Sequence, residues 1–330
     1  MPVTLRRGTV TGITERHDGL VRLEVDGRPC VAYPSVTGPV ALGDDVLVNV
    51  QAVELGLGSG GFDLLHANLT RGLGLPAEDG AHVMKLPYTS LQHAAPHAEE
   101  DWGDDPVADL AGLPVVACSL HSQVAPVCAG LGNELGAAYV QLAGGALPVP
   151  LSDTVRLLCK QGYLRTTVAV GPCLGGEIEC VTPASALLAC ALAEVDVVVC
   201  AIGPGVVGTG SRFGHGALAA ASALVTAAAL GGRPVLAPRV SSADERERHR
   251  GLSHHTLAVL QLARGEVTVA WPEGLDPPAE LADVEVVDAS GWRDACAGLP
   301  LSHMGRGPDE EPWFFAAAYA AGRLARSLAV

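Results

Sequence analysis

Lysine and aromatic residues are scarce in this sequence, and acidic charge outweighs basic charge. Lysine occurs only at Lys85 and Lys160, and aromatic residues make up 4% of the 330 residues. Arginine therefore supplies nearly all of the positive charge, within a formal net charge of -15 at pH 7. Because binding to nucleic acid depends largely on basic surface that releases counterions, we expect neither nucleic acid nor an anionic membrane as a partner.

A paired-cysteine spacing is also missing, since no Cys-x-x-Cys occurs among the 9 cysteines. Cys173, Cys180, Cys190 and Cys200 lie in or beside apolar runs, where cysteine behaves as a small hydrophobic residue. We predict buried thiols rather than disulfides or a metal cage. This holds for Cys173 too, although it lies in a glycine-rich segment where a thiol could be activated.

Long hydrophobic runs are absent as well. The longest, Gly216–Leu230, is shorter than the roughly 20 residues that span a bilayer. The first residues lack the apolar core of a secretory signal. Together with the unpaired cysteines, these features indicate a cytoplasmic protein.

Apolar residues, by contrast, are abundant. Hydrophobic residues make up 48% of the chain and charged residues 17%, enough for a large core and two domains. Residues 1–70 alternate polar and apolar residues between Asp-Gly and Gly-Asp turns, which predicts a small antiparallel β-barrel, OB-like or SH3-like. Residues 71–112 are polar and include the acidic run Glu99–Asp105, which predicts a linker or lid. The sequence leaves a homo-oligomer open.

Residues 113–330 change to apolar strands alternating with helix-length segments. The predicted strands are Pro114–Cys118, Ala138–Leu142, Thr166–Val170, Val195–Ala201, Pro234–Ala237 and Glu266–Ala270. The predicted helices are Val124–Leu135, Ser152–Gln161, Pro183–Glu194, Gly216–Leu230, Ser253–Ala263 and a docking helix Ala316–Leu328. This rhythm predicts an α/β fold with a Rossmann-like, mostly parallel sheet covered on both faces.

Two polar loops follow successive predicted strands, and ligands of such sheets bind at the carboxyl ends of the strands. The loops are Gly203–Gly216 and Arg239–His255. Their content of Gly, Arg, His, Asp and Ser exceeds what core packing needs. We therefore predict that they form one site, with Arg212 and His254 within reach of one small ligand.

The first loop contains Gly-x-Gly-x-x-Gly after a strand, the spacing of a dinucleotide fingerprint. The expected helix begins only near Gly216, later than that fingerprint requires. The next predicted strand is followed by Arg239, Ser241 and Ser242. If a dinucleotide did bind, these residues would suit the 2'-phosphate of NADP better than the free ribose of NAD. The sequence favours a simpler anion cradle, in which backbone N–H groups join Arg212. The glycines of that cradle are Gly203, Gly205, Gly208 and Gly210.

The second loop ends in Ser253-His254-His255, and Ser253 is placed to cap the following helix. The two histidines then lie in the first turn of that helix, where neutral imidazole acts as a base or a metal ligand. A divalent metal is possible, and its candidate ligands are His254, His249, Asp244 and His121. We expect His254 and His255 to point to different sides of the helix, so that both cannot easily ligate one ion.

Polar residues after two other predicted strands are also considered for catalysis or binding. Glu177 follows a predicted strand and is a candidate for acid or base catalysis. Ser119 and Ser122 flank His121 at the end of another strand, but no Gly-x-Ser-x-Gly elbow is present to make either a nucleophile. His121 is therefore assigned to ligand binding.

Four segments together are similar to a known family. They are Ala32–Pro39, His82–Gln92, Gly203–Gly210 and Arg246–His255. The sequence resembles the bacterial domain-of-unknown-function family 3866, and the similarity ends with Met304–Gly307. The resemblance implies a bacterial origin and brings no established activity.

The residues themselves predict a protein that binds a small anionic, phosphorylated molecule and that hydrolyses it or transfers a group. Arg212, Arg239 and Ser253 would bind the anion, His254 or His249 would move protons, and Asp244 or Glu177 would orient or activate them. A non-catalytic metabolite sensor or assembly protein is the alternative. An oxidoreductase that uses NADP is the third possibility.

Overall fold

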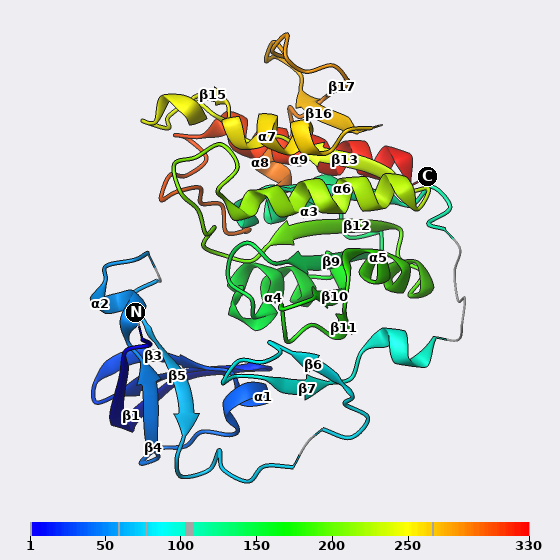
Figure 1. Cartoon of the computed structure of the whole chain (residues 1–330). Coiled ribbons are helices and arrows are strands. Elements are labelled where there is room, and N and C mark those ends of the chain that lie inside the picture. Colours follow the sequence, from blue (N-terminus) through cyan, green and yellow to red (C-terminus); the bar gives the residue numbers. More distant parts are fainter. Residues whose placement is uncertain (1, 59, 77, 103–108, 266, 330) are drawn as a thin grey trace. The chain divides into compact units, whose positions relative to one another are not determined.

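A computed structural model describes residues 2–58, 60–76, 78–102, 109–265 and 267–329 (Figure 1). The chain divides into two compact units, Met1–Pro96 and His97–Val330. Of the acidic run Glu99–Asp105, residues 103–105 lie outside the described residues. Among the described helices none is both long and apolar enough to cross a membrane.

The first unit is built on a closed five-stranded barrel in the order β1-β2-β3-β5-β4. Its strands are β1 (Leu5–His17), β2 (Leu20–Val25), β3 (Arg28–Ala32), β4 (Asp45–Asn49) and β5 (Asp63–Asn68). The long strand β1 pairs with both β2 and β4, and β3 runs parallel to β5. Of the two predicted barrels this is the OB-like one, a five-stranded Greek-key closure. Alternate residues of the strands, such as Val21, Leu23 and Val25, fill its interior.

Short elements complete this unit. Helix α1 (Pro34–Thr37) follows β3, and α2 (Gln51–Glu54) follows β4. Strands β6 (Val83–Lys85) and β7 (His93–Ala95) form an antiparallel pair within the segment predicted as a linker.

The second unit contains an eight-stranded sheet in which all of the neighbouring strands are parallel. The order is β11-β10-β9-β12-β8-β13-β16-β17. The strands are β8 (Pro114–Cys118), β9 (Ala137–Leu142), β10 (Leu164–Val170), β11 (Ile178–Cys180), β12 (Val197–Ile202), β13 (Arg233–Ala237), β16 (Thr268–Pro272) and β17 (Val284–Val287). The strands β8, β9 and β12 are buried along their whole length, as expected for a parallel sheet covered on both faces.

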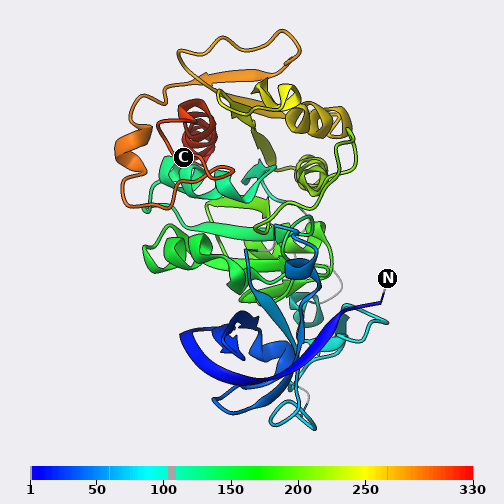
Figure 2. The same cartoon turned by 90° about the vertical axis from the view of Figure 1, so that its left-hand side faces the viewer.

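Helices cover both faces of this sheet (Figure 2). One face packs on α3 (Val124–Leu131), α4 (Asp153–Lys160), α8 (Trp292–Ala295) and α9 (Pro312–Leu328). The other packs on α5 (Pro183–Leu192), α6 (Ala219–Ala229) and α7 (His254–Leu262). The predicted α/β fold is thus confirmed, and the docking helix begins at Pro312.

The chain order brings three loops together at the carboxyl edge of the sheet. Strand β8 lies between β12 and β13, so the segments after these three strands are neighbours. The connection from β8 to β9 runs through α3 on one face, whereas β12 connects to β13 through α6 on the other. Such a reversal is the place where parallel sheets bind ligands.

Short elements shape these loops. The segment after β8 forms a 3₁₀ turn, η2 (His121–Gln123), and α6 is preceded by η4 (Gly216–Leu218). After β13 come the paired strands β14 (Val240–Ser241) and β15 (Gly251–Leu252), with η5 (Glu247–His249) between them. Two more 3₁₀ turns are η1 (Ala98–Asp101) and η3 (Val149–Leu151).

Candidate functional site

Four histidines from the two predicted loops meet at the carboxyl edge of the sheet. We call His215, His249, His254 and His255 the histidine cluster. The rings of His215 and His255 stack with centroids 3.7 Å apart, and His254 lies 5.6 Å from His215 and 4.6 Å from His255. The ring of His249 lies 4.7 Å from that of His254 and 4.8 Å from that of His255. The two loops therefore lie side by side, although about 40 residues of chain separate His215 from His254.

The start of α7 positions two members of the cluster. Ser253 caps this helix as predicted, because its Oγ accepts a hydrogen bond from the backbone N–H of His255 at 3.2 Å. The same Oγ lies 2.7 Å from Nδ1 of His249. One serine thus fixes the helix start and a third histidine.

The expectation that His254 and His255 diverge is wrong. They are the first two residues of α7, and side chains of a helix lean toward its N-terminus. Because no helical turn precedes these two residues, nothing stands between their side chains at that end. Both rings therefore extend beyond the start of the helix and meet His215.

Two of the imidazoles each have a buried ring nitrogen without a hydrogen-bond partner. Nε2 of His215 donates to the backbone oxygen of Arg212 at 2.9 Å, because a carbonyl can only accept. Its Nδ1 therefore carries a lone pair, and this atom is buried without a hydrogen-bond partner. Nε2 of His254 is likewise buried and unpartnered. Such atoms are uncommon in folded proteins and call for an explanation.

All four imidazoles are uncharged at neutral pH. Burial, with neighbouring positive charge, lowers the pKa of His249 to about 3 and that of His254 to about 4. Burial also lowers the pKa of His255 to about 2 and lowers the pKa of His215. Each ring therefore has one nitrogen able to accept a proton or bind a metal.

A buried ion network lies next to the cluster. Arg239 is 2% exposed, and its Nη2 donates to Oδ2 of Asp244 at 3.2 Å while its Nη1 lies 3.3 Å from Nδ1 of His255. Asp244 also accepts from Arg246, at 2.8 Å, and lies 3.5 Å from Arg306. These partners hold the pKa of Asp244 well below its ordinary value, led by its hydrogen bond with Arg246. Asp244 and Arg239 are therefore committed to this network, and Arg239 also contacts His255 of the cluster.

Glu311, at the start of α9, extends this network. Its side chain is fully buried and accepts from Ser241 Oγ at 2.6 Å, from the backbone N–H of Ser242 at 2.9 Å, and from Arg306 at 2.8 Å. The serines predicted to favour NADP are thus held by a carboxylate, which disfavours a 2'-phosphate beside them.

Two arginines at the cluster are exposed. Arg212 stacks over the ring of Phe213, with its guanidinium 5.3 Å from the ring centroid. Arg248 lies beside Gly210, with Nη1 3.8 Å from where a Cβ on that glycine would be. Within the described part of the chain neither is in an ion pair. Exposed cations thus lie in the same two loops as the uncharged imidazoles.

The glycines of the predicted anion cradle differ in their surroundings and in their backbone conformation. Gly203 packs against the backbone oxygen of Ala146, 2.1 Å from where a Cβ would lie, and Gly205 has φ of 73°. Gly208 pairs with His215 in an isolated β-bridge. Gly210 has open space apart from Arg248. The following helix begins at Gly216, so these glycines do not open a helix as a dinucleotide fingerprint would.

His121 belongs to a different set of contacts. Its Nε2 lies 2.7 Å from Ser152 Oγ, its Nδ1 donates to the backbone oxygen of Ile202 at 3.2 Å, and its ring lies edge-on to Tyr139. These contacts tie β8, β9 and β12 together. The predicted metal set therefore is not assembled, because His121 and Asp244 are committed to other partners. The group that is assembled is His215, His254 and His255, with one nitrogen of each within 4.8 Å of the others.

Glu177 does not reach the site. After β10 the chain turns back at once, and β11 starts with Ile178 opposite Val168, in the middle of β10. Glu177 therefore lies beside the strand interior, where Thr166 donates to it at 2.8 Å. The acid or base role predicted for Glu177 has no support in this placement.

The cysteines are free thiols, as predicted, and all but Cys159 are buried. Cys173 is fully buried. No thiol contributes to the histidine cluster.

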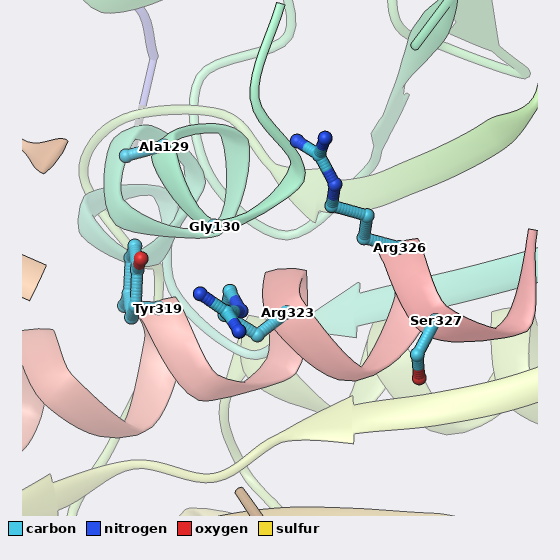
Figure 3. Close-up of a pocket in the computed structure, with 6 residues that line it drawn as sticks. All are labelled: Ala129, Gly130, Tyr319, Arg323, Arg326 and Ser327. Atoms are coloured by element: carbon cyan, nitrogen blue, oxygen red, sulfur yellow. The ribbon is translucent and has the colours of Figure 1, made fainter. Parts of the chain in front are cut away.

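A hollow elsewhere in this unit is a weaker candidate (Figure 3). Ala129, Gly130, Tyr319, Arg323, Arg326 and Ser327 of α3 and α9 line it. It lies near the amino edge of the sheet, because the neighbouring Leu328 accepts a hydrogen bond from Arg233 at the start of β13. It has arginines but no neutral base.

Sequence reasoning missed several residues of this region. His215 lies within the predicted first loop but was not among the predicted site residues. His303, Arg306 and Glu311 come from a segment after the last strand, and His303 is buried with its ring stacked 3.8 Å from that of Phe314. The repeated glycines of Met304–Gly307 were the available signal.

The family comparison covers this whole region. The model of a protein family described as "Protein of unknown function (DUF3866)" matches residues 29–322. The chain belongs to this family. The match in this DUF3866 member includes both loops, the histidine cluster and Glu311. No curated protein matches the chain.

Proposed function

We propose that this protein is an enzyme that binds a small anionic, phosphorylated molecule at the histidine cluster and hydrolyses it or transfers a group from it. The observation that carries this proposal is the pairing of uncharged imidazoles with exposed arginines at the carboxyl edge of the sheet. Nucleophilic attack on a phosphorylated centre needs cations to hold the anion and a lone pair to prepare the attacking group.

The residues divide these tasks by exposure. Arg212 and Arg248 are exposed and free to hold an anion, whereas Arg239 and Asp244 are buried and fix the position of His255. Nδ1 of His215 and Nε2 of His254 have no hydrogen-bond partner, and one nitrogen of each of these rings lies within 4.8 Å of the other. We also propose a cytoplasmic location, supported by nine free cysteines.

A thermal-shift screen with inorganic phosphate and a panel of phosphomonoesters tests binding. Ligand at about 100 times its Kd adds roughly 2.7 kcal/mol to the unfolding free energy. Arg212→Ala and Arg248→Ala should each weaken binding of the ligand found in this way by about 1.5–3 kcal/mol, the range for hydrogen bonds to charged groups. Arg264→Ala, at an exposed position just after α7, is the matched control and should bind normally.

The outcomes separate the candidate functions. Product formation from a bound phosphomonoester supports the enzyme. Binding that both arginines support, without turnover of any panel member, favours the metabolite sensor instead. If no phosphorylated compound shifts the transition, or if neither arginine matters, the proposal is wrong.

A further inference from the structure

The histidine cluster contains three nitrogens arranged for one ion. His215 comes from the loop after β12, and His254 and His255 from the start of α7. One nitrogen of each lies within 4.8 Å of the other two. Among the residues that the structure describes, this is the one group of three His, Cys, Asp or Glu side chains with such convergence.

Two ring nitrogens in this group have no hydrogen-bond partner. Nδ1 of His215 and Nε2 of His254 are buried polar atoms without partners, and leaving such an atom unsatisfied costs about 1–3 kcal/mol. A bound cation would remove that cost.

The surroundings of His215 match those of a metal ligand. Ligating histidines nearly always donate their other ring N–H to a carbonyl or carboxylate, which fixes the tautomer. Nε2 of His215 donates to the backbone oxygen of Arg212 at 2.9 Å, and this leaves Nδ1 as the ligand atom. Imidazole nitrogen suits zinc and its neighbours in the first transition row rather than Mg²⁺ or Ca²⁺.

We propose that His215, His254 and His255 bind a divalent transition-metal ion of the zinc class, with a further position open to water or substrate. Three histidines and one open position make a catalytic rather than a structural zinc site. Tetrahedral ligands 2.0–2.1 Å from zinc lie about 3.3 Å from one another. From present separations of up to 4.8 Å, the rings would move closer and turn toward the ion to reach this spacing. The inference stands on the cluster alone and does not depend on the proposed substrate.

The contact between Arg239 and His255 gives a specific consequence. Guanidinium can only donate, so Nδ1 of His255 accepts from Arg239 and its proton lies on Nε2. A metal ion on either nitrogen is incompatible with this hydrogen bond and tautomer. Metal binding should therefore break the contact, while Asp244 keeps the other side of Arg239 in place.

Titration of the metal-free full-length protein with Zn²⁺, and with Co²⁺ as a spectroscopic probe, tests the site. The wild type should bind one equivalent of each ion, with the intense visible absorption of four- or five-coordinate Co²⁺. His215→Asn and His254→Asn should each bind either ion more weakly. Changing a group that merely supports a metal ligand lowers affinity about 10–100-fold, and losing a ligand should cost at least as much. His17→Asn, at an exposed position on the barrel, controls for adventitious binding to surface histidines.

A variant with a different metal-binding side chain distinguishes loss of a ligand from loss of folding. In His254→Cys, a thiolate should restore Co²⁺ binding and add sulfur-to-cobalt charge-transfer absorption in the near ultraviolet. Circular dichroism of each metal-free variant checks that it is folded.

Three results would overturn the proposal. They are no binding of Zn²⁺ or Co²⁺ by the wild type, unchanged affinity in folded His215→Asn and His254→Asn, or a Co²⁺ spectrum of His254→Cys without a sulfur band. None of them decides whether phosphorylated compounds bind, so the two proposals can fail separately.

Discussion

The position of His215 depends on one glycine. Gly208 faces His215 across an isolated bridge, and a Cβ at Gly208 would lie 2.9 Å from Cβ of His215. Side chains at residue 208 and His215 therefore cannot share this space without movement. Gly208 acts by allowing a histidine to reach the cluster, which differs from the backbone cradle predicted from the sequence.

Gly208→Val should displace His215 while leaving the sheet intact. We expect at least a tenfold loss of Zn²⁺ affinity, within the about 10–100-fold range for changes around a metal ligand. Gly210→Ala is the control, because a Cβ there meets only Arg248 at 3.8 Å. Calorimetric titration of both variants measures the effect, and equal affinities would refute it.

His121 makes stability depend on pH. Burial lowers its pKa from 6.5 to about 4, so as the pH falls the unfolded chain takes up this proton first. Stability from this group is therefore complete above pH 6.5 and is lost as the pH falls toward 4. Each unit of the difference corresponds to about 1.4 kcal/mol.

We therefore expect the urea-unfolding free energy to fall between pH 7 and pH 4.5. His121→Gln, which cannot be protonated in this range, should be less stable at pH 7 and lose less on acidification. An equal loss in both proteins would contradict the assignment to His121. Asp244 contributes nothing to this window, since its partners hold its pKa well below the ordinary value of 3.8.

At the scale of elements, the start of α7 combines folding with site geometry. Ser253 caps the helix and also contacts His249, so one side chain serves both. A fixed start of α7 also fixes the positions of His254 and His255, its first two residues. The hydrogen bonds of Ser253 therefore define where α7 begins more firmly than the helix propensity of its residues would.

Ser253→Ala should cost about 1 kcal/mol of unfolding free energy, the usual value for a lost N-cap. It should also weaken Zn²⁺ binding, because the start of α7 is less fixed. Ser302→Ala, at an exposed position, should change neither quantity. Chemical denaturation and metal titration of both variants decide the matter.

Helices α3 and α9 approach each other through glycine. A Cβ on Gly130 would lie 2.3 Å from the backbone oxygen of Tyr319, and one on Gly322 would lie 2.0 Å from that of Val127. Backbone oxygens cannot move aside as flexible side chains can. This crossing holds α9 on the sheet and so holds Glu311 at the site.

Gly322→Ala should destabilise the protein by about 1–3 kcal/mol, the cost of overpacking a close contact. The gain in helix propensity from alanine is about 1 kcal/mol and does not offset a forced separation of two helices. Gly291→Ala, with open space around it, is the control. A midpoint of thermal unfolding no lower than the wild-type value would show that the crossing is loose.

At the scale of the whole molecule, the boundary between the two compact units falls after Pro96, earlier than the predicted start at residue 113. Part of the predicted linker belongs to the second unit, since Glu99 accepts a hydrogen bond from the backbone N–H of Val181 at 2.7 Å. The segment near Glu99 thus anchors the edge of the sheet.

A fragment of residues 97–330 should fold alone, because the sheet has its own core on both faces. We expect cooperative thermal unfolding and Zn²⁺ affinity equal to that of the full chain. A fragment that begins at residue 109 should be less stable, because it lacks Glu99. A molten or insoluble 97–330 fragment would show that the barrel is required for folding.

The sequence alone determined the fold class and most of the strands. Apolar runs such as Val115–Cys118 are buried on both sides, and hydrophobic periodicity reports burial directly. It also determined the cap at Ser253 and the two loops that meet. It could not distinguish OB-like from SH3-like closure, because strand alternation does not specify which strands pair.

Only the tertiary structure decided which side chains share the site. His215 joined the cluster, while Glu177 and His121 were directed elsewhere by β11 and by contacts with Ser152 and Ile202. Arg306 and Glu311 reached Asp244 and Ser241 from a segment more than 60 residues away. Local sequence sets the direction of a strand or the start of a helix. The distances between lone pairs, however, depend on the packing of whole elements, which no short stretch of residues encodes.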